Sequence, residues 1–435
     1  MTAPVIGFAG LTHLGLNMAA ASAARGFEVV GYHDDAALAA AIAAGDLPVS
    51  EPGLAELITT AGDRLTFTAD ATALSRCDMV YISVDVPTDD RGQSDLTPIR
   101  GMIDQAESVL APGAMLIVLC QVPPGFTRAL GRNPETTYYQ VETLIFGRAV
   151  ERAMNPERFI VGCARPDAPI DPRLTAHLEA FGCPVLPMRY ESAELAKISI
   201  NMCLVASIGV ANTMAELCEN VDADWSEIVP ALRLDARIGP KSYIAPGLGL
   251  AGGNLERDLA TVIGLAEAHG TDAGIVRAWI ANSVHRKDWC FRVLQKEVLA
   301  ADPGAAVGLL GLAYKEDTHS TKNAASLALL AHLDVTRVTA HDPEVRAETL
   351  VPDLRQADTP LDACDGADAV IIDTPWPIYR DLDPAAIAAR MRGRTLIDPY
   401  GLLPRDAARD AGLDHFTLGR PPERAAATNA GARRA

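Results

Sequence analysis

The sequence predicts an α/β protein in which two doubly wound domains are joined by a central helical domain. Three observations support this prediction. A strand–turn–helix–strand pattern opens the chain at residues 4–32, one long apolar helix occupies residues 192–220, and short apolar strands alternating with helices resume at residue 306. Alternation of this kind favours parallel sheets that are covered by helices on both faces. With 435 residues, the chain has room for two or three domains of about 100–200 residues each.

The first domain begins with an apolar strand at residues 4–9, followed by the sequence GLTHLG at 10–15. An alanine-rich helix to about residue 25 and a strand at 27–32 complete the pattern of a dinucleotide-binding, Rossmann-like domain. In such a turn, the first glycine, here Gly10, makes the tight turn, the middle one lets the backbone approach the pyrophosphate, and the last, here Gly15, permits close packing of helix on strand. Thr12 replaces the middle glycine, so its side chain crowds the pyrophosphate while its hydroxyl offers a hydrogen bond. A plain strand–helix turn is the competing interpretation.

An acidic residue is expected to close the second strand, because a carboxylate there binds the ribose hydroxyls of a dinucleotide. The candidates are His33, Asp34 and Asp35. Two further buried strands, at residues 78–84 and 114–120, end in polar loops. Ligands bind at the carboxyl ends of parallel strands. Thr88, Gln121 and Thr127 are therefore candidate site residues by position alone.

The pattern then changes to one long helix at residues 192–220, followed by helices at 227–234, 258–268 and 273–298. Lys197 and Asn201 are four residues apart and share a face of the first helix. A lysine in an apolar helix either extends its ammonium group to solvent or serves in a site. A helical block between two α/β halves indicates a linker or the core of a dimer.

The stretch PGLGLAGGNLERD at residues 246–258 holds four glycines within seven residues. This density of glycine indicates left-handed backbone or close approach to a ligand. The polar residues Asn254, Glu256, Arg257 and Asp258 are candidates for an active site at this stretch. A surface loop that only needs turn residues is the competing interpretation.

Strands and helices alternate again in the last third of the chain. Strands are expected at residues 306–314, 337–340, 369–372 and 395–398, with a helix at about 323–333. The loop at 314–320 offers a pocket for a nucleoside phosphate. We divide the chain into a first Rossmann-like domain at 1–191, a central helical dimerisation domain at 192–300, a second Rossmann-like domain at 301–420 and a flexible tail at 421–435.

Composition narrows the classes of partner. The formal net charge of −18 argues against nucleic acid or an anionic membrane, because both require a basic surface. No basic segment precedes the first strand, and no uninterrupted apolar run reaches about 18 residues, so we expect neither a signal peptide nor a membrane span. Eight cysteines without a CxxC pair argue against a metal site or a disulfide framework. A cytoplasmic location is the simplest expectation.

Taken together, these segments resemble the UDP-glucose/GDP-mannose dehydrogenase family over nearly the whole chain, from Val5 to about Gly419. The matching motifs are GLTHLG (10–15), SEPGL (50–54), VPT with DL following (86–88 and 95–96), PPGFT (123–127), NPERFIVG (155–162), ELAKISIN (194–201), RIGP (237–240), PGLGLAGG (246–253), GLAYK (311–315) and TPWPIY (374–379). The resemblance implies an NAD-binding domain, a homodimer formed through the central helix, and a C-terminal domain that binds a nucleotide-activated sugar.

The resemblance also assigns roles to individual residues. Lys197 and Asn201 match groups that stabilise a developing alkoxide, whereas Glu142 and Asp258 match groups that order a water or relay a proton. No metal is implied. The implied substrate contacts are Arg237, Tyr243, Gly249, Gly252 and Lys315, and the implied cofactor contacts are Gly10, Thr12, Leu14, Gly15, His33, Asp34, Pro87 and Thr88.

The chain departs from the family at the residue that defines its product. Members oxidise a sugar primary alcohol twice, to a carboxylate, through a thioester on a cysteine of the glycine-rich loop. That position is Asn254 here, and an amide cannot act as the nucleophile. Gln121 replaces a threonine near the reacting carbon, Arg257 replaces a lysine, and His33 stands at the position of the ribose-binding acid. The polar site residues that are kept, namely Glu142, Lys197, Asn201 and Asp258, indicate altered rather than lost chemistry.

We therefore predict an NAD-dependent enzyme that removes one hydride from a sugar hydroxyl, with re-reduction as in an epimerase and without formation of a carboxylate. The Ala-, Arg- and Asp-rich composition is typical of a high-GC bacterium, in which antibiotic or unusual-sugar biosynthesis is one setting. The alternatives are the usual four-electron nucleotide-sugar 6-dehydrogenase, a sugar dehydratase, and a non-catalytic paralogue that binds nucleotide sugars.

Overall fold

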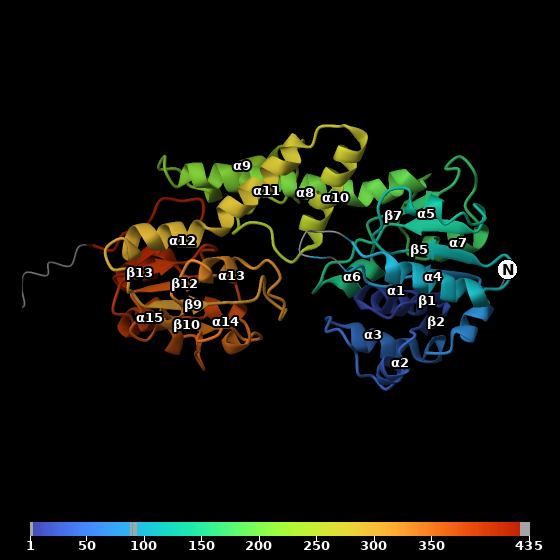
Figure 1. Ribbon diagram of the computed structural model, residues 1–435, viewed down its shortest axis with the longest axis horizontal. Coiled ribbons are helices and arrows are strands. Elements are labelled where there is room, and N and C mark those ends of the chain that lie inside the picture. The colour runs from blue at the N-terminus through green and yellow to red at the C-terminus, as the bar shows by residue number, and fades with distance from the viewer. Residues whose placement is uncertain (1–2, 88, 90–93, 427–435) are drawn as a thin grey trace, which may run out of the picture. The chain divides into compact units, whose positions relative to one another are not determined.

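The computed structural model describes residues 3–87, 89 and 94–426, and it divides into two compact units, Met1–Ile200 and Asn201–Ala435 (Figure 1). Each unit contains one sheet with helices on both of its faces. The predicted class, two Rossmann-like sheets with additional central helices, is confirmed.

The first unit is built on an eight-stranded sheet in the order β3-β2-β1-β4-β5-β6-β7-β8. Neighbouring strands are parallel except β6 and β7, so β7 and β8 run opposite to the other six. The strands are β1 Val5–Ala9, β2 Glu28–Tyr32, β3 Leu65–Thr68, β4 Met79–Ile82, β5 Met115–Val118, β6 Thr137–Gln140, β7 Phe159–Cys163 and β8 Val185–Arg189.

Both faces of this sheet are buried, which explains why its strands are continuous apolar runs rather than alternating ones. Val29 and Tyr81 belong to the core on one face, and Val30 and Val80 belong to the core on the other. The helices of this unit are α1 His13–Ala24, α2 Ala36–Ala43, α3 Leu54–Ala61, α4 Thr97–Val109, α5 Phe126–Ala129, α6 Ala149–Met154 and α7 Pro172–Glu179.

Helix α8, Tyr190–Cys218, corresponds to the long helix predicted at 192–220. Within the described part of the chain, it is the one helix that is long and apolar enough to cross a membrane on length and composition alone. A core helix of a globular protein passes the same test, so this observation is weak support for a membrane span.

The second unit contains a six-stranded, wholly parallel sheet in the order β11-β10-β9-β12-β13-β14. One apolar core packs against it and includes residues of the nearby helices, such as Trp289 and Leu294. The strands are β9 Val307–Leu310, β10 Val338–His341, β11 Arg355–Gln356, β12 Ala369–Ile372, β13 Thr395–Ile397 and β14 Asp414–Phe416.

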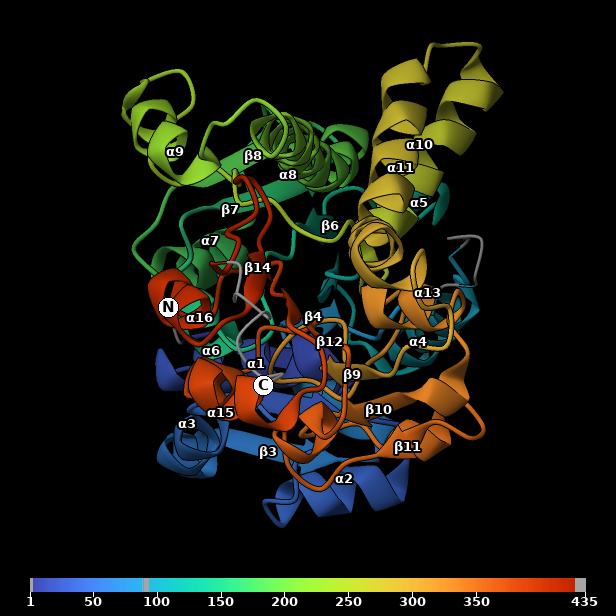
Figure 2. The same cartoon turned by 90° about the vertical axis from the view of Figure 1, so that its left-hand side faces the viewer.

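The helices of the second unit differ from the prediction at two points. The predicted helix 273–298 is divided at Asp288, and the predicted helix 258–268 begins four residues earlier, at Asn254. Helices α10 and α11 lie side by side (Figures 1 and 2). The helices are α9 Trp225–Leu234, α10 Asn254–His269, α11 Gly274–Lys287, α12 Trp289–Leu294, α13 Ala325–Leu330, α14 Pro377–Arg380, α15 Pro384–Arg390 and α16 Arg405–Asp410.

The early start of α10 corrects the expectation that the polar residues after the glycines lie in a loop. The four polar residues from Asn254 to Asp258 occupy the first turns of the helix. Gly253 is the N-cap with φ +99°, and its amide donates to Glu256 Oε2 at 2.9 Å. A left-handed glycine followed three residues later by glutamate is a strong local signal for a helix start, because it satisfies an otherwise unpaired amide.

Candidate functional site

The turn after β1 is tight because two glycines leave no room for side chains. Gly10 has φ +106°, and a Cβ at that residue would lie 2.7 Å from the amide nitrogen of Val84. A Cβ on Gly15 would lie 1.9 Å from the carbonyl oxygen of Gly10. The first amides of α1 therefore face the carboxyl edge of the sheet, where the positive end of a helix attracts phosphate. The predicted residues Gly10, Leu14 and Gly15 thus form a turn that fits the pyrophosphate of a dinucleotide.

Thr12, which stands in place of the middle glycine, is held by the neighbouring strand. It is the N-cap residue of α1, and its hydroxyl donates to the carbonyl oxygen of Ser83 at 3.0 Å. The hydroxyl also contacts the carboxyl group of Asp85, whose pKa is raised by burial. The Thr12 hydroxyl, which was expected to bond a pyrophosphate, is therefore already bonded within the protein.

The end of β2 distinguishes among the three candidates for the ribose-binding acid. Asp35 caps α2, because its Oδ1 accepts the amides of Ala37 at 2.8 Å and Leu38 at 3.1 Å. Asp34 is exposed and lies with Oδ1 3.2 Å from Nδ1 of His33. The carboxylate of Asp34 is thus open to solvent at the edge where a ribose would bind, whereas that of Asp35 serves the helix.

Glu51 is a residue of this site that the sequence interpretation missed. Its buried carboxylate accepts the amides of Gly147 at 2.6 Å and Ala149 at 3.1 Å. It also lies 2.8 Å from Nε2 of His13, at the start of α1, and the His13 ring stacks on Phe146 at 4.0 Å. Glu51 thereby fixes the loop before α6 against the dinucleotide turn. The SEPGL motif was visible in the sequence, but no spacing rule connects it with residues almost 100 positions away.

The first unit also pairs two of the predicted catalytic residues. Lys197 Nζ lies 3.4 Å from Oε2 of Glu142, which follows β6, and both side chains are partly buried. Gln121 follows Cys120 at the end of β5. Burial, with further contributions from nearby carboxylates that include Glu142, raises the pKa of the Cys120 thiol. Glu142, Lys197 and the end of β5 are therefore neighbours, while Thr88 lies outside the described residues.

The second unit pairs another two predicted residues. Asn201 Nδ2 donates to Oδ2 of Asp258 at 2.5 Å, and Asp258 is fully buried. Arg257, also buried, places Nε 3.6 Å from Oδ1 of the same carboxylate. Asn254 stands one helical turn before Asp258, so both lie on one face of α10, and its side chain is exposed. An exposed amide thus lies one turn before a buried carboxyl group on that face.

The glycine-rich stretch contacts its neighbours closely at the two glycines predicted to meet the substrate. A Cβ on Gly249, which has φ +83°, would lie 2.5 Å from the carbonyl oxygen of Ser283. A Cβ on Gly252, with φ +89°, would lie 2.8 Å from the ring of Tyr314, and its amide donates to the Lys322 carbonyl at 3.0 Å. The stretch is therefore a fitted segment and not a loose surface turn.

A cavity of about 420 Å³ opens beside this stretch within the second unit. Two cationic side chains, Arg233 and Lys241, contribute to its wall, which gives it local positive character on an acidic protein. Its lining residues are Ile208, Arg233, Pro240, Lys241, Ser242, Tyr243, Ile244, Ala245, Gly247 and Gly249. A phosphate-bearing ligand suits this charge and size.

Two of the five predicted substrate contacts, Tyr243 and Gly249, line this cavity, and the other three, Arg237, Gly252 and Lys315, do not. Arg237 pairs with Asp235 at 2.7 Å on the surface, and its side chain is 89% exposed. Lys315 lies over the ring of Tyr314, with Nζ 5.9 Å from the ring centre. Sequence reasoning did not select Arg233 or Lys241, because a single cation in a polar segment carries no distinguishing pattern.

Comparison with known proteins gives a consistent result along the chain. Residues 4–174 match the NAD-binding domain of the UDP-glucose/GDP-mannose dehydrogenase family. Residues 191–283 match the central domain of that family, and residues 308–405 match its UDP-binding domain.

Individual relatives agree with the domain matches. A UDP-glucose 6-dehydrogenase of Pseudomonas aeruginosa is 30% identical and covers 95% of this chain and 96% of its own length. A UDP-glucose 6-dehydrogenase of Haloferax volcanii is 30% identical over 94% of this chain and 98% of its own length. The structure of a UDP-glucose dehydrogenase from Pyrobaculum islandicum superimposes with a TM-score of 0.82, at 26% identity, over 96% of this chain and 98% of its own.

Proposed function

The chain belongs to the UDP-glucose/GDP-mannose dehydrogenase family, and on this basis we propose that it oxidises a primary alcohol of a nucleotide-activated sugar to the carboxylate, using two molecules of NAD. The observation that supports this proposal most strongly is the similarity to UDP-glucose 6-dehydrogenases, at 28–30% identity over about 95% of the chain. NAD is the cofactor, in keeping with the NAD-binding domain and the turn at Gly10 and Gly15.

The prediction of a single hydride transfer with re-reduction, as in an epimerase, is wrong. The relatives that cover nearly the whole chain are named UDP-glucose 6-dehydrogenases, which supports the alternative of a nucleotide-sugar 6-dehydrogenase. The prediction treated the missing thiol at Asn254 as the factor that decides the product. An aldehyde in water also adds water, so the absence of a thiol does not by itself stop oxidation at the aldehyde. A role in antibiotic or unusual-sugar biosynthesis stays a prediction.

Bound NAD supplies the hydride acceptor for both oxidations. In the first unit, the Lys197 ammonium group would stabilise the negative charge that develops on the sugar oxygen, and Glu142, 3.4 Å away, would hold that ammonium in place. In the second unit, the buried Asp258 carboxylate would accept a proton, and Asn201 at 2.5 Å would hold that carboxylate. These roles follow from charge and position.

The second oxidation requires a nucleophile on the aldehyde carbon, and we assign that role to water. Six of the eight cysteines are buried, and none lies in the glycine-rich stretch at 246–253. Cys203 is exposed, but it lies two residues after Asn201 on the same helix and therefore faces a different side from Asn201. Water would form the new C–O bond, a carboxylate such as Asp258 would take its proton, and the exposed Asn254 amide would orient the resulting diol.

The cavity in the second unit is the proposed binding site of the nucleotide. Arg233 and Lys241 would face the diphosphate, and the exposed ring of Tyr243 would contact the adjoining sugar or base. Local cations of this kind are needed because the protein as a whole carries a net charge of −18 and repels anions at long range.

We also propose that the protein acts in the cytoplasm as a homodimer formed through α8. Val210, Met214 and Leu217 are exposed at intervals of four and three residues, so they form one apolar stripe on that helix. Light scattering after size exclusion should give a dimer for the wild type and a monomer for Leu217→Glu. Val284→Glu, an exposed apolar position on α11, is the matched control. A monomeric wild type would refute this assembly.

The enzymatic proposal is tested by product stoichiometry. Purified protein is incubated with NAD and a panel of nucleotide sugars that includes UDP-glucose, and NADH and sugar products are quantified. Two NADH and one carboxylate per sugar are expected. One NADH with a released carbonyl product, or no turnover of any sugar, would refute a four-electron dehydrogenase. Retained activity in a Cys183→Ser, Cys203→Ser variant is expected if water is the nucleophile, and its loss would implicate a thiol.

A further inference from the structure

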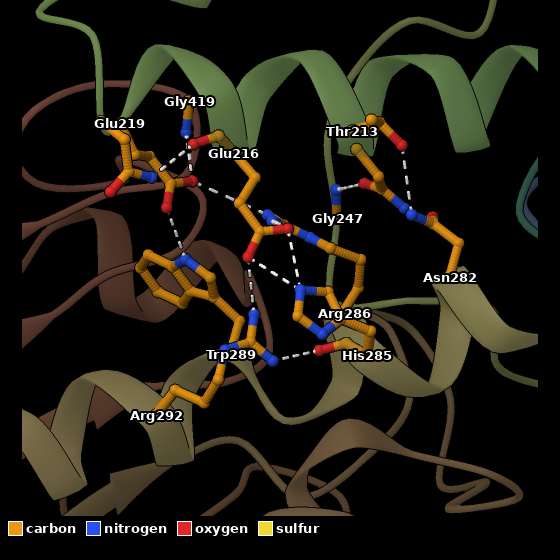
Figure 3. A network of polar contacts seen from close by, with 12 residues as sticks. Thr213, Glu216, Glu219, Gly247, Asn282, His285, Arg286, Trp289, Arg292 and Gly419 are labelled. Atoms are coloured by element: carbon orange, nitrogen blue, oxygen red, sulfur yellow. Dashed lines mark hydrogen bonds and ion pairs between the residues drawn. The ribbon is translucent and has the colours of Figure 1, made fainter.

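An ion-pair cluster centred on a buried arginine joins α8 to α11 in the second unit (Figure 3). The side chain of Arg286, on α11, is fully buried. Its Nη1 lies 3.2 Å from Oε2 of Glu216, on α8, and its Nη2 lies 3.8 Å from Oε1 of Glu219, directly after the end of that helix. These are ion-pair contacts without hydrogen-bond geometry, since the guanidinium nitrogens have no hydrogen-bond partner. Burying a guanidinium group is costly unless carboxylates lie close to it, so the cluster fixes the separation of the two helices.

Two further side chains contact the same cluster. His285 Nε2 lies 2.8 Å from Glu216, and Arg292 Nη2 lies 2.9 Å from the same carboxylate (Figure 3). Burial by itself would raise the pKa of Glu216, but the hydrogen bond from His285 and the charges of Arg286 and Arg292 hold it below its usual value. Glu216 therefore stays ionised and continues to attract α11.

The same two helices hold the glycine-rich stretch, and they do so one turn before the cluster. On α8, Asn212 precedes Glu216 by four residues, and its Oδ1 accepts the amide of Gly247 at 2.8 Å. On α11, Ser283 precedes Arg286 by three residues, and its Oγ accepts the amide of Leu250 at 2.8 Å. Residues three and four apart share a helix face, so each anchor lies directly beside a member of the cluster.

The segment that follows β14 is attached to the same cluster. Glu219 accepts the amide of Gly419, which follows β14, at 2.9 Å, and the indole Nε1 of Trp289 at 2.8 Å (Figure 3). One carboxylate thus serves α8, α12 and the segment after the last strand. Loss of its charge would disturb all three together.

We propose that Arg286 is a positioning residue for the glycine-rich stretch at 246–253, because it sets the spacing of the two helices from which Asn212 and Ser283 hold that stretch. The inference rests on the proposed function only in treating the stretch as part of the reaction site. The physical reason is that two hydrogen bonds from different helices can be satisfied together only at one helix separation. The arginine itself touches neither Gly247 nor Leu250 by any hydrogen bond in the described structure.

Hydrogen exchange of the 246–253 amides tests this proposal in the full chain. Arg286→Met should raise exchange in this stretch at least about tenfold, because the two anchors lose their common spacing. Arg277→Met is the matched control, since Arg277 lies on the same helix in an exposed pair with Glu267 at 2.6 Å. The control should stay within about twofold of the wild type. Arg286→Lys should fall between the two, because it restores the charge without the planar fork.

Two further measurements separate positioning from general stability. Arg286→Met should lower kcat about tenfold or more while the Kd for NADH, which reports on the first unit, stays unchanged. If Arg286→Met does not fold, Glu219→Gln should produce a several-fold rise in exchange over 246–253. The proposal is overturned if a folded Arg286→Met or Glu219→Gln variant exchanges these amides like the wild type. The proposal is also overturned if amide exchange rises equally in α10 and in residues 246–253. The exchange measurement needs no substrate, so it stands apart from a failure of the proposed function.

Discussion

Replacing Asp373 with asparagine should make the stability of this protein less sensitive to pH. Asp373 follows β12 and is 5% exposed, and its Oδ1 has no hydrogen-bond partner in the described structure. Burial raises the pKa of its carboxyl group from 3.8 to about 7, with only partial opposition from the Cys290 thiol and the Ser326 amide. The folded protein therefore holds this proton much more tightly than the unfolded chain does.

The sign and the size of the effect follow from that difference. Below the unfolded pKa, both states are protonated and there is no penalty. Between about pH 4 and pH 7, the unfolded chain releases the proton first, so stability falls by about 1.4 kcal/mol per pH unit and then levels off. The full penalty is about 4 kcal/mol, and about 2 kcal/mol of it accumulates between roughly pH 5.5 and pH 8. Asparagine does not titrate, so the variant should escape this loss.

Urea unfolding, followed by circular dichroism at several pH values across this range, measures the effect. The stability difference between Asp373→Asn and the wild type should shift in favour of the variant by about 2 kcal/mol from the acidic to the alkaline end. Asp381→Asn, at an exposed position, should show no such shift. A difference between Asp373→Asn and the wild type that is independent of pH would show that this carboxyl group does not titrate with the assigned pKa.

Two other substitutions test the site directly. Gly252→Ala places a Cβ 2.8 Å from the Tyr314 ring at φ +89° and should destabilise the protein by about 1–3 kcal/mol in urea unfolding. Its control is Gly264→Ala, at an exposed position of α10 where a Cβ meets open space. This substitution should stabilise the protein by about 0.5–1 kcal/mol. Equal effects of the two would contradict the fitted geometry of the stretch. Lys197→Met removes the ammonium 3.4 Å from Glu142 and should lower kcat about 10²- to 10³-fold in an NADH assay, and an unchanged kcat would exclude Lys197 from the reaction.

Several features of this fold could be predicted because they depend on local sequence. The turn at 10–15 is one, since the contacts of Gly10 and Gly15 admit no side chain and the preceding strand is continuously apolar. The long helix at 192–220 is another, and it occurs as α8 within two residues at each end. The start of α10 was placed four residues late, because the left-handed Gly253 cap was interpreted as part of a loop.

Other features could not be predicted because they join residues far apart in the sequence. Glu51 meets Gly147 across 96 positions, and Glu219 meets Gly419 across 200. The reversal of direction at β7 is likewise a property of strand pairing, which no local pattern records. The partners of a buried carboxylate are set by the folded structure, because many distant backbone amides could donate to it equally well.

By itself, the sequence determined the α/β class, the dinucleotide turn and the family, because glycine positions and apolar periodicity are local and specific. Its departure at Asn254 led to a wrong product, since one residue was weighed against the likeness of the whole chain. Only the tertiary structure decided which groups meet, namely Lys197 with Glu142, Asn201 with Asp258, and Arg286 with its two glutamates. The physical reason is that charge pairing acts over a few ångströms in space and leaves no trace in sequence spacing.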